Sequence, residues 1–175
     1  MDCPRYDGRI QVFHSAVSTF FAPSDLSGVG GMKREHIRMS PKWRNRHARK
    51  DCVFVITDPN IPGMRGMDIG QVLTFFFSFR LRCQYYPCAV IRWFNRIDDA
   101  PDEDTGMWVV SPSSDGNHAH YAVIHVEAIF HSAHLIPVYG TEPLPSSIQS
   151  YHVLDIFNLF YVNKYADHHA FEIAW

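Results

Sequence analysis

The chain has 175 residues, 46% of them apolar and 14% aromatic, and its formal net charge is −2. This length and composition exclude a disordered protein, and we expect one domain over residues 1–175. No apolar run approaches the roughly 18–20 residues that cross a bilayer, and the first residues lack a secretory signal, so we expect a soluble, intracellular protein with no membrane partner.

The first predicted element covers residues 9–21, where apolar Ile10, Val12 and Ala16 alternate with more polar neighbours. This alternation predicts one strand or two short ones. A glycine-containing loop follows, and after it comes a basic segment, residues 33–50. It holds eight Lys or Arg against one acid, Glu35, while the rest of the chain holds eight basic and seventeen acidic residues. We expect a turn of helix in the segment before Pro41.

Residues 53–57, VFVIT, form a short β-rich run, and residues 69–97 are the densest hydrophobic stretch. In the latter stretch apolar residues alternate with Thr, Ser and Arg on two arms, which predicts a hairpin with one buried face and one wet face. We expect a three-residue loop of Arg82, Cys83 and Gln84. This loop places Leu81 opposite Tyr85, Phe77 opposite Ala89 and Leu73 opposite Trp93.

Beyond the hairpin, residues 98–104 are an acidic connection with five Asp or Glu. Short strands are expected at 107–110, 120–126 and 134–139, and a proline-rich linker at 140–150. Apolar residues then recur at spacings of three and four, which predicts a C-terminal helix over about 151–166. The expected fold is mainly β: a small antiparallel β-barrel, with its core at about 51–140 and the C-terminal α-helix packed on it.

Several long motifs carry a family resemblance: SDLSGVGGMKREHIR, TDPNIPGMRGMDIGQV, YPCAVIRWFNR, PDEDTGMWVV, HLIPVYG and FYVNKYADHHAFEIA. They resemble the C-terminal region of Plavaka-type transposon proteins, which belong to CACTA-like elements of mushroom-forming fungi. The resemblance implies a fungal, transposon-derived, nuclear protein that works on DNA. It also implies a detached or truncated C-terminal module whose transposase catalytic domain lies upstream, and it transfers no catalytic residue.

The middle of the chain is similar in layout to bromo-adjacent homology (BAH) domains, β-barrels that bind chromatin proteins. Trp93, Phe94 and Arg96 match the W-F-x-R segment that these domains often carry on a barrel strand. The resemblance implies a BAH-like barrel and a chromatin partner.

The basic segment is the first candidate site. Clustered cations neutralise phosphates and release counterions, and an aromatic ring can stack on a base. The residues expected to bind nucleic acid are Lys42, Trp43, Arg44, Arg46, Arg49 and Lys50, with Trp43 as the stacking ring. The alternative is a solvated loop whose charges balance the acidic connection at 98–104.

The second candidate is a partner surface on the outer face of the hairpin, made of Arg80, Arg92, Phe94 and Arg96. Arginine beside aromatic rings suits a nucleic acid or a protein partner. The alternative is that the C-terminal helix covers this face.

Neither the eleven histidines nor the acidic connection has the spacing of a metal site, and no phosphate-binding loop or nucleophile motif is present. We therefore expect no enzyme, no metal and no cofactor. The expected function is a non-catalytic DNA- or chromatin-binding module. The alternative is a scaffold domain that docks a transposase core without touching nucleic acid.

Overall fold

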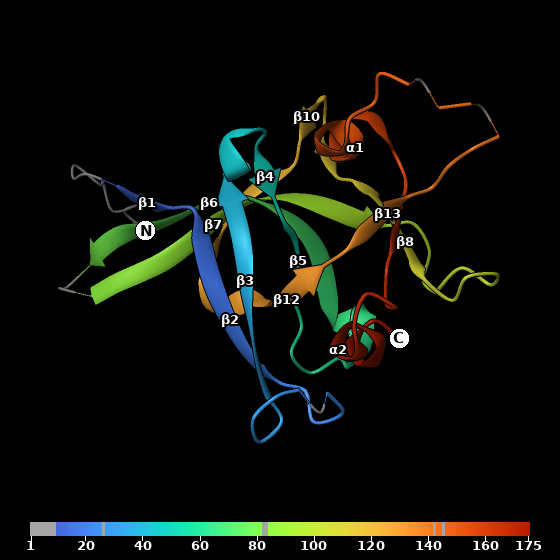
Figure 1. Cartoon of the computed structure of the whole chain (residues 1–175). Helices are drawn as coiled ribbons and strands as arrows, with labels where there is room; N and C mark the ends of the chain where they lie inside the picture. Colours follow the sequence, from blue (N-terminus) through green and yellow to red (C-terminus); the bar gives the residue numbers. More distant parts are fainter. Residues whose placement is uncertain (1–9, 26, 82–83, 142, 145) are drawn as a thin grey trace.

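The computed structural model describes residues 10–25, 27–81, 84–141, 143–144 and 146–175, except for the side chains of residue 45 and of residues 77–85. Antiparallel strands make up most of it (Figure 1). The main sheet runs in the order β12 (Ile129–Ala133), β5 (Cys52–Ile56), β6 (Met67–Leu81), β7 (Gln84–Arg96), β8 (Trp108–Pro112), β14 (Phe160–Val162) and β13 (Leu135–Pro137). Two further strands, β1 (Gln11–Phe13) and β11 (Tyr121–His125), pair with β6 and β7 respectively.

The main sheet is a nearly closed barrel because its two ends follow each other along the chain. β12 pairs with β5, β13 pairs with β14, and only His134 separates β12 from β13. The His134 carbonyl oxygen accepts a hydrogen bond from the Asn163 N–H at 2.8 Å. One bent stretch of chain therefore connects the two end strands of the sheet, which brings the sheet close to closure.

A smaller sheet lies across the main one and consists of β2 (Ser15–Phe21), β3 (Met32–Ser40) and β4 (Arg49–Lys50) (Figure 1). The prediction of strand structure over residues 9–21 is confirmed from residue 11 on, as β1 and β2, and residue 9 lies outside the described part of the chain. The predicted turn of helix before Pro41 is wrong, because β3 continues to Ser40. Ile37 and Met39 alternate with less buried neighbours along β3, and that period of two is typical of a strand.

The remaining elements are short. They are η1 (Trp43–Asn45), η2 (Gly63–Gly66), β9 (Ser114–Asp115), β10 (His118–Ala119), η3 (Val126–Ala128), η4 (Ser150–His152), α1 (Val153–Ile156) and α2 (His168–Ile173). None of the described helices is long and apolar enough to cross a membrane.

The predicted helix over 151–166 is wrong. Only η4 and the four-residue α1 are helical there, and β14 follows as a strand of the main sheet. Phe160 and Val162 are fully buried, while Tyr161 between them is only half-buried. Pairing with β8 on one side and β13 on the other selects the extended conformation and overrides the helical spacing.

The central hairpin is confirmed as β6 and β7, but its predicted register is wrong. Leu81 pairs with Gln84, so Gln84 belongs to β7 and not to a three-residue loop. Farther along, Phe75 pairs with Ala89 and Gly70 with Trp93. Two irregularities in β6, between Val72 and Thr74 and between Phe77 and Arg80, shift the pairing in steps. Bulges of this kind increase the strand twist that closing a barrel requires.

The middle of the hairpin is buried on both faces, contrary to the prediction of one wet face. Phe54, Ile69 and Phe94 pack in the cluster that includes Trp108 and Phe160. A second cluster lies on the opposite face, beneath the small sheet; its buried members are Ile37, Met39, Val53, Val55, Val72, Phe75, Ala89 and Ile91. The small sheet thus covers the face that carries Ala89 and Ile91, while Phe94, on the face that sequence alternation assigns to solvent, lies in the barrel core.

Candidate nucleic-acid interface

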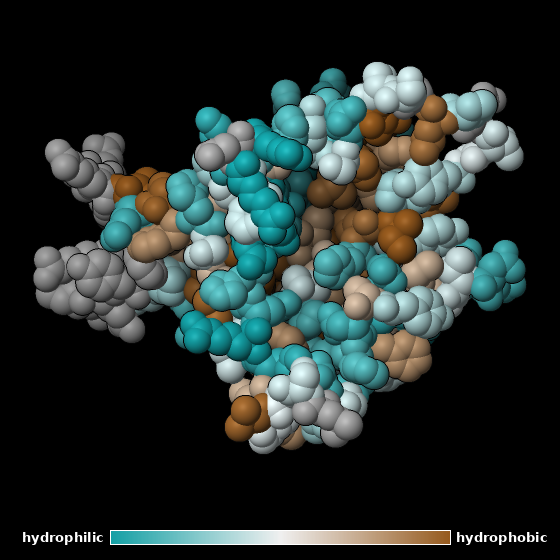
Figure 2. Space-filling model, in the orientation of Figure 1, coloured by the Kyte–Doolittle hydropathy of each residue, from teal (hydrophilic) through white to brown (hydrophobic). Residues whose placement is uncertain are grey.

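A groove opens between the loop that carries η1 and the segment that carries η4 and α1. Its volume is about 820 Å³. Figure 2 shows it as a hollow beside the hydrophilic stripe of β3 and β4, with hydrophobic side chains on its other side. We call it the basic groove; it is lined by Trp43, Arg44, Arg46, His47, Ala48, Arg49, Lys50, Gln71, Ser150, Tyr151, His152, Leu154 and Asp155. A second hollow, of about 630 Å³, adjoins it and shares Arg49, Lys50, Ser150 and Leu154 with it.

The structure brings five of the six predicted nucleic-acid-binding residues together on one wall of this groove. They are Trp43, Arg44, Arg46, Arg49 and Lys50, and Lys42 directly precedes them, exposed. Arg49 is paired with Asp51, whose Oδ1 lies 2.7 Å from the Arg49 Nε. Within the described residues, Lys42, Arg44, Arg46 and Lys50 have no ion-pair partner. Four positive charges are therefore left uncompensated at the groove.

The described basic side chains of residues 33–50 form no ion pair with the acidic connection at 98–104. Asp102 instead accepts hydrogen bonds from the Thr105 hydroxyl at 2.6 Å and the Thr105 N–H at 2.9 Å. These hydrogen bonds lower the pKa of the Asp102 carboxyl. Asp102 is therefore satisfied within its own turn, and no acid of the connection pairs with the basic wall among the described residues.

Trp43 is half-buried and surrounded by guanidinium groups. The Cζ atoms of Arg49, Arg38 and Arg44 lie 5.1, 5.2 and 5.7 Å from its ring centroid. Cation–π attraction at such distances holds the arginines in place. The predicted role of Trp43 as a stacking ring therefore competes with these contacts, and the geometry suits a platform that positions arginines.

Arg44 has an unusual backbone. Its φ of 49° and ψ of 38° place it in the left-handed region, which a residue with a side chain rarely adopts. Such strain is stored where the surroundings hold the chain, often at functional sites. Here the conformation turns the chain sharply between two exposed arginines, Arg44 and Arg46.

Sequence reasoning missed three rings of the groove: Tyr151 and His152 on the opposite wall, and His47 on the basic wall. The His47 and Tyr151 rings stack across the groove with centroids 3.7 Å apart and planes 19° apart. His152 meets Tyr151 edge to face, with centroids 4.1 Å apart. His47 and Tyr151 are 104 positions apart in the chain, so no local pattern could have joined them.

Gln71 is the second residue that sequence reasoning missed. It is 7% exposed and lines the groove from β6, and its side-chain amide makes no hydrogen bond to the described residues. The amide is not among the buried side-chain atoms left without a partner, so it is open to the groove. The sequence offered one signal for it: Gln71 is a polar residue inside the apolar run IGQVL. In the structure this run lies in β6, a central strand of the sheet.

The predicted partner surface is not brought together as one exposed patch. Phe94 is 2% exposed and belongs to the barrel core, and the Arg80 side chain lies outside the described part of the chain. Arg92 pairs with Asp155 of α1 at 3.3 Å. Arg96 lies 3.7 Å from Asp68 and over the Trp108 ring at 5.8 Å. Val153, Leu154 and Phe157 of the C-terminal segment pack against the barrel core.

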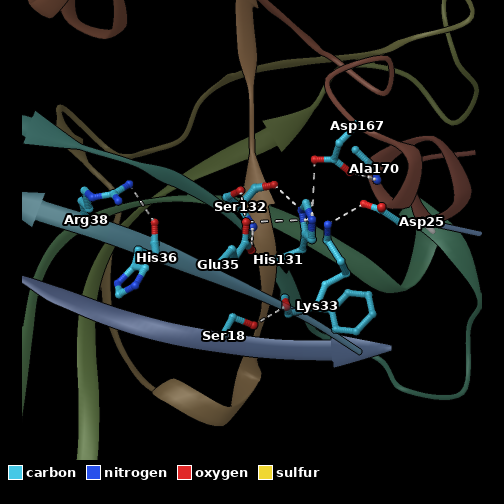
Figure 3. Close-up of polar contacts among 11 residues, drawn as sticks. Ser18, Asp25, Lys33, Glu35, His36, Arg38, His131, Ser132, Asp167 and Ala170 are labelled. Atoms are coloured by element: carbon cyan, nitrogen blue, oxygen red, sulfur yellow. Dashed lines mark hydrogen bonds and ion pairs between the residues drawn. The ribbon is translucent and has the colours of Figure 1, made fainter. Parts of the chain in front are cut away.

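A separate polar cluster lies between the two sheets and α2 (Figure 3). The Glu35 carboxylate accepts two hydrogen bonds from Ser132, while His131 Nε2 lies 4.0 Å from Glu35 and 3.7 Å from Asp167. The Ser132 hydroxyl donates to the carboxylate and not to the imidazole, which is not the order of a catalytic triad. His131 is 1% exposed, and the cluster has a structural role because it holds β3, β12 and the start of α2 together.

No group of three or more His, Cys, Asp or Glu side chains among the described residues is arranged to hold a metal ion. No protein-family model, curated protein or solved structure matched the chain.

Proposed function

We propose that this chain is a non-catalytic DNA- or chromatin-binding module that contacts nucleic acid through the basic groove. The observation that carries the proposal is the group of four cations, Lys42, Arg44, Arg46 and Lys50, without ion-pair partners among the described residues. Positive charge gathered on one wall of a concave site favours phosphate binding, because each neutralised phosphate releases counterions. The whole chain carries a net charge of −2, so attraction of this kind must be local.

The resemblance to Plavaka-type transposon proteins supports a nuclear, fungal, transposon-derived origin. In this proposal the module adds nucleic-acid contact to a transposase catalytic domain. The nearly closed antiparallel sheet is also compatible with a BAH-like barrel, and this finer assignment is part of the proposal.

The test is fluorescence anisotropy of a labelled mixed-sequence 20-base-pair duplex with the full chain, from about 50 to 300 mM salt. We expect the logarithm of the binding constant to fall linearly with the logarithm of the salt concentration. The double variant Arg46→Ala/Lys50→Ala should lower the magnitude of this slope by about 0.9 for each phosphate that is no longer neutralised. Its matched control is Arg34→Ala/Arg65→Ala, which removes two exposed cations that do not line the basic groove.

A second function, protein docking without nucleic acid, is favoured by one observation. β11 lies off the main path of the sheet, and it exposes 55% of Tyr121 and 61% of Val123. Exposed apolar and aromatic side chains on a peripheral strand suit a protein partner such as a transposase core. Absence of duplex and single-strand binding at about 50 mM salt would favour this second function over the first.

A further inference from the structure

The basic groove combines three features that together restrict its ligand: uncompensated cations on one wall, a stacked pair of rings in its lining, and the amide of Gln71, which faces the groove and has no hydrogen-bond partner among the described residues. We propose that the groove binds a single-stranded segment of nucleic acid, with phosphates along the basic wall and one base inserted toward Gln71. This inference rests on the proposed function and names its ligand class.

The charge distribution orients the strand. Arg44, Arg46 and Lys50 line one side and have no ion-pair partner among the described residues. Asp155 on the far side is already paired with Arg92, and Leu154 beside it is apolar. A phosphodiester backbone is attracted electrostatically to the basic side and has no comparable attraction to the side that carries Asp155 and Leu154. Bases attached to that backbone therefore face the rings and Leu154.

The rings provide a place for a base to stack. The His47 and Tyr151 rings are nearly parallel, and their centroids, 3.7 Å apart, show that they overlap face to face; His47 is exposed and Tyr151 is 38% exposed. A base can add its flat face to this pair, as bases do on the aromatic residues of single-strand-binding proteins. Trp43 is a poorer platform, because three guanidinium groups already surround its ring.

Gln71 supplies the hydrogen bonds that an inserted base needs. A side-chain amide offers two donors and one acceptor oxygen, and this one has no partner in the described residues. The Watson–Crick edges of the bases in a duplex are paired inside the helix, so they reach this amide only after unpairing and unstacking, whereas those of a single strand are already free. The volume of about 820 Å³ is in the range of small-ligand sites and accommodates a nucleotide.

The experiment compares three labelled 20-mers of the same mixed sequence: single-stranded DNA, single-stranded RNA and duplex DNA. Anisotropy is measured with the full chain across a salt series, and we expect both single strands to bind at least tenfold more tightly than the duplex. The DNA and RNA arms decide which sugar the groove accepts. Equal or tighter binding of the duplex, with a normal salt slope, overturns this inference and leaves the proposed function standing. Failure of all three probes at about 50 mM salt overturns both.

Two variants separate stacking and amide hydrogen bonds from charge. Tyr151→Ala should weaken single-strand binding roughly tenfold, within the range known for removing one aromatic ring from beneath a base. Gln71→Met keeps the length of the side chain but removes its donors and acceptor, and it should weaken binding at least threefold. Neither variant changes the charge, so the salt slope should stay as it is in the unaltered chain.

Tyr165→Ala is the matched control, because Tyr165 is 60% exposed and does not line the groove. The thermal midpoint of each variant is measured first, and affinities are compared at a temperature where all are folded. Unchanged single-strand affinity in folded Tyr151→Ala and Gln71→Met overturns the inference.

Discussion

Glu35 of β3 and Ser132 of β12 are joined by two hydrogen bonds of 2.6 Å, one from the Ser132 N–H and one from its hydroxyl. They link the small sheet to the closing strand of the barrel across 97 positions of sequence (Figure 3). Glu35→Gln leaves one acceptor oxygen for two donors, so we expect the free energy of unfolding to fall by about 2 kcal/mol in denaturant titrations. The control is Glu127→Gln, whose carboxylate is exposed and should matter little. A Glu35→Gln loss no larger than the control would contradict this account.

His169 makes the stability depend on pH. Burial, aided by neighbouring His131, lowers the pKa of His169, and its Nδ1 has no hydrogen-bond partner among the described residues. The unfolded chain, with a histidine pKa near 6.5, therefore binds more protons than the folded chain in the window below that value. The free energy of unfolding should fall as the pH drops below about 6.5, by at most about 1.4 kcal/mol per pH unit from this group.

His169→Phe should flatten that dependence, because phenylalanine keeps the stacking on Phe20, whose ring centroid lies 4.4 Å away, and has no proton to bind. The control is His168→Phe on the exposed side of α2, which should retain the slope of the unaltered chain. Parallel pH profiles for the two variants between pH 5 and 7.5 would argue against a buried neutral His169.

We expect the Cys52 thiol not to react with alkylating reagents in the folded protein. It is 5% exposed in the barrel core, and burial, with the Asp51 charge, raises the pKa of its thiol to about 12. Because the thiolate is the reactive form, iodoacetamide at pH 8 should leave Cys52 unmodified in the native chain and modify it in guanidinium. Peptide mass spectrometry measures both, and rapid native labelling of Cys52 would be inconsistent with its place in the core.

Substitution of Phe160 tests whether residues 160–162 form the buried strand β14 in place of the predicted helix. It is fully buried, whereas Leu159 beside it is 39% exposed. Phe160→Ala should cost about 3–5 kcal/mol of unfolding free energy and Leu159→Ala less than about 1 kcal/mol. Similar losses for the two variants in denaturant titrations would contradict the burial of Phe160 at the start of β14.

Two substitutions of Arg44 distinguish the effect of its charge on binding from the effect of its backbone strain on stability. Glycine adopts the left-handed conformation freely, but it also loses more entropy on folding, by about 0.4–1 kcal/mol. Arg44→Gly should therefore leave the free energy of unfolding within about 1 kcal/mol of the unaltered chain, while Arg44→Ala, which keeps the strain, should be the less stable variant. Both should weaken nucleic-acid binding alike, because each removes the same charge. Denaturant and salt titrations together measure these effects, and a glycine variant less stable than the alanine variant would contradict the strain.

The amino-acid sequence by itself determined the local features of this protein. Alternation of apolar and polar residues specified the central hairpin and the strands of residues 9–21, because side chains on a strand sort between two faces within a few residues. A run of β-favouring residues specified the strand near residues 53–57. The charge run at 33–50 marked one wall of the basic groove for the same local reason, since its cations are close together in the chain.

Only the tertiary structure decided whether residues 160–162 are helix or strand, which face of the hairpin meets solvent, and what lies opposite the basic wall. Each depends on partners far away in the chain: β8 and β13 for Phe160, the small sheet for Val72, and Tyr151 for His47. A spacing pattern records which side chains share a face of one element. It does not record which distant element covers that face, and here that contact selected the conformation and built the groove.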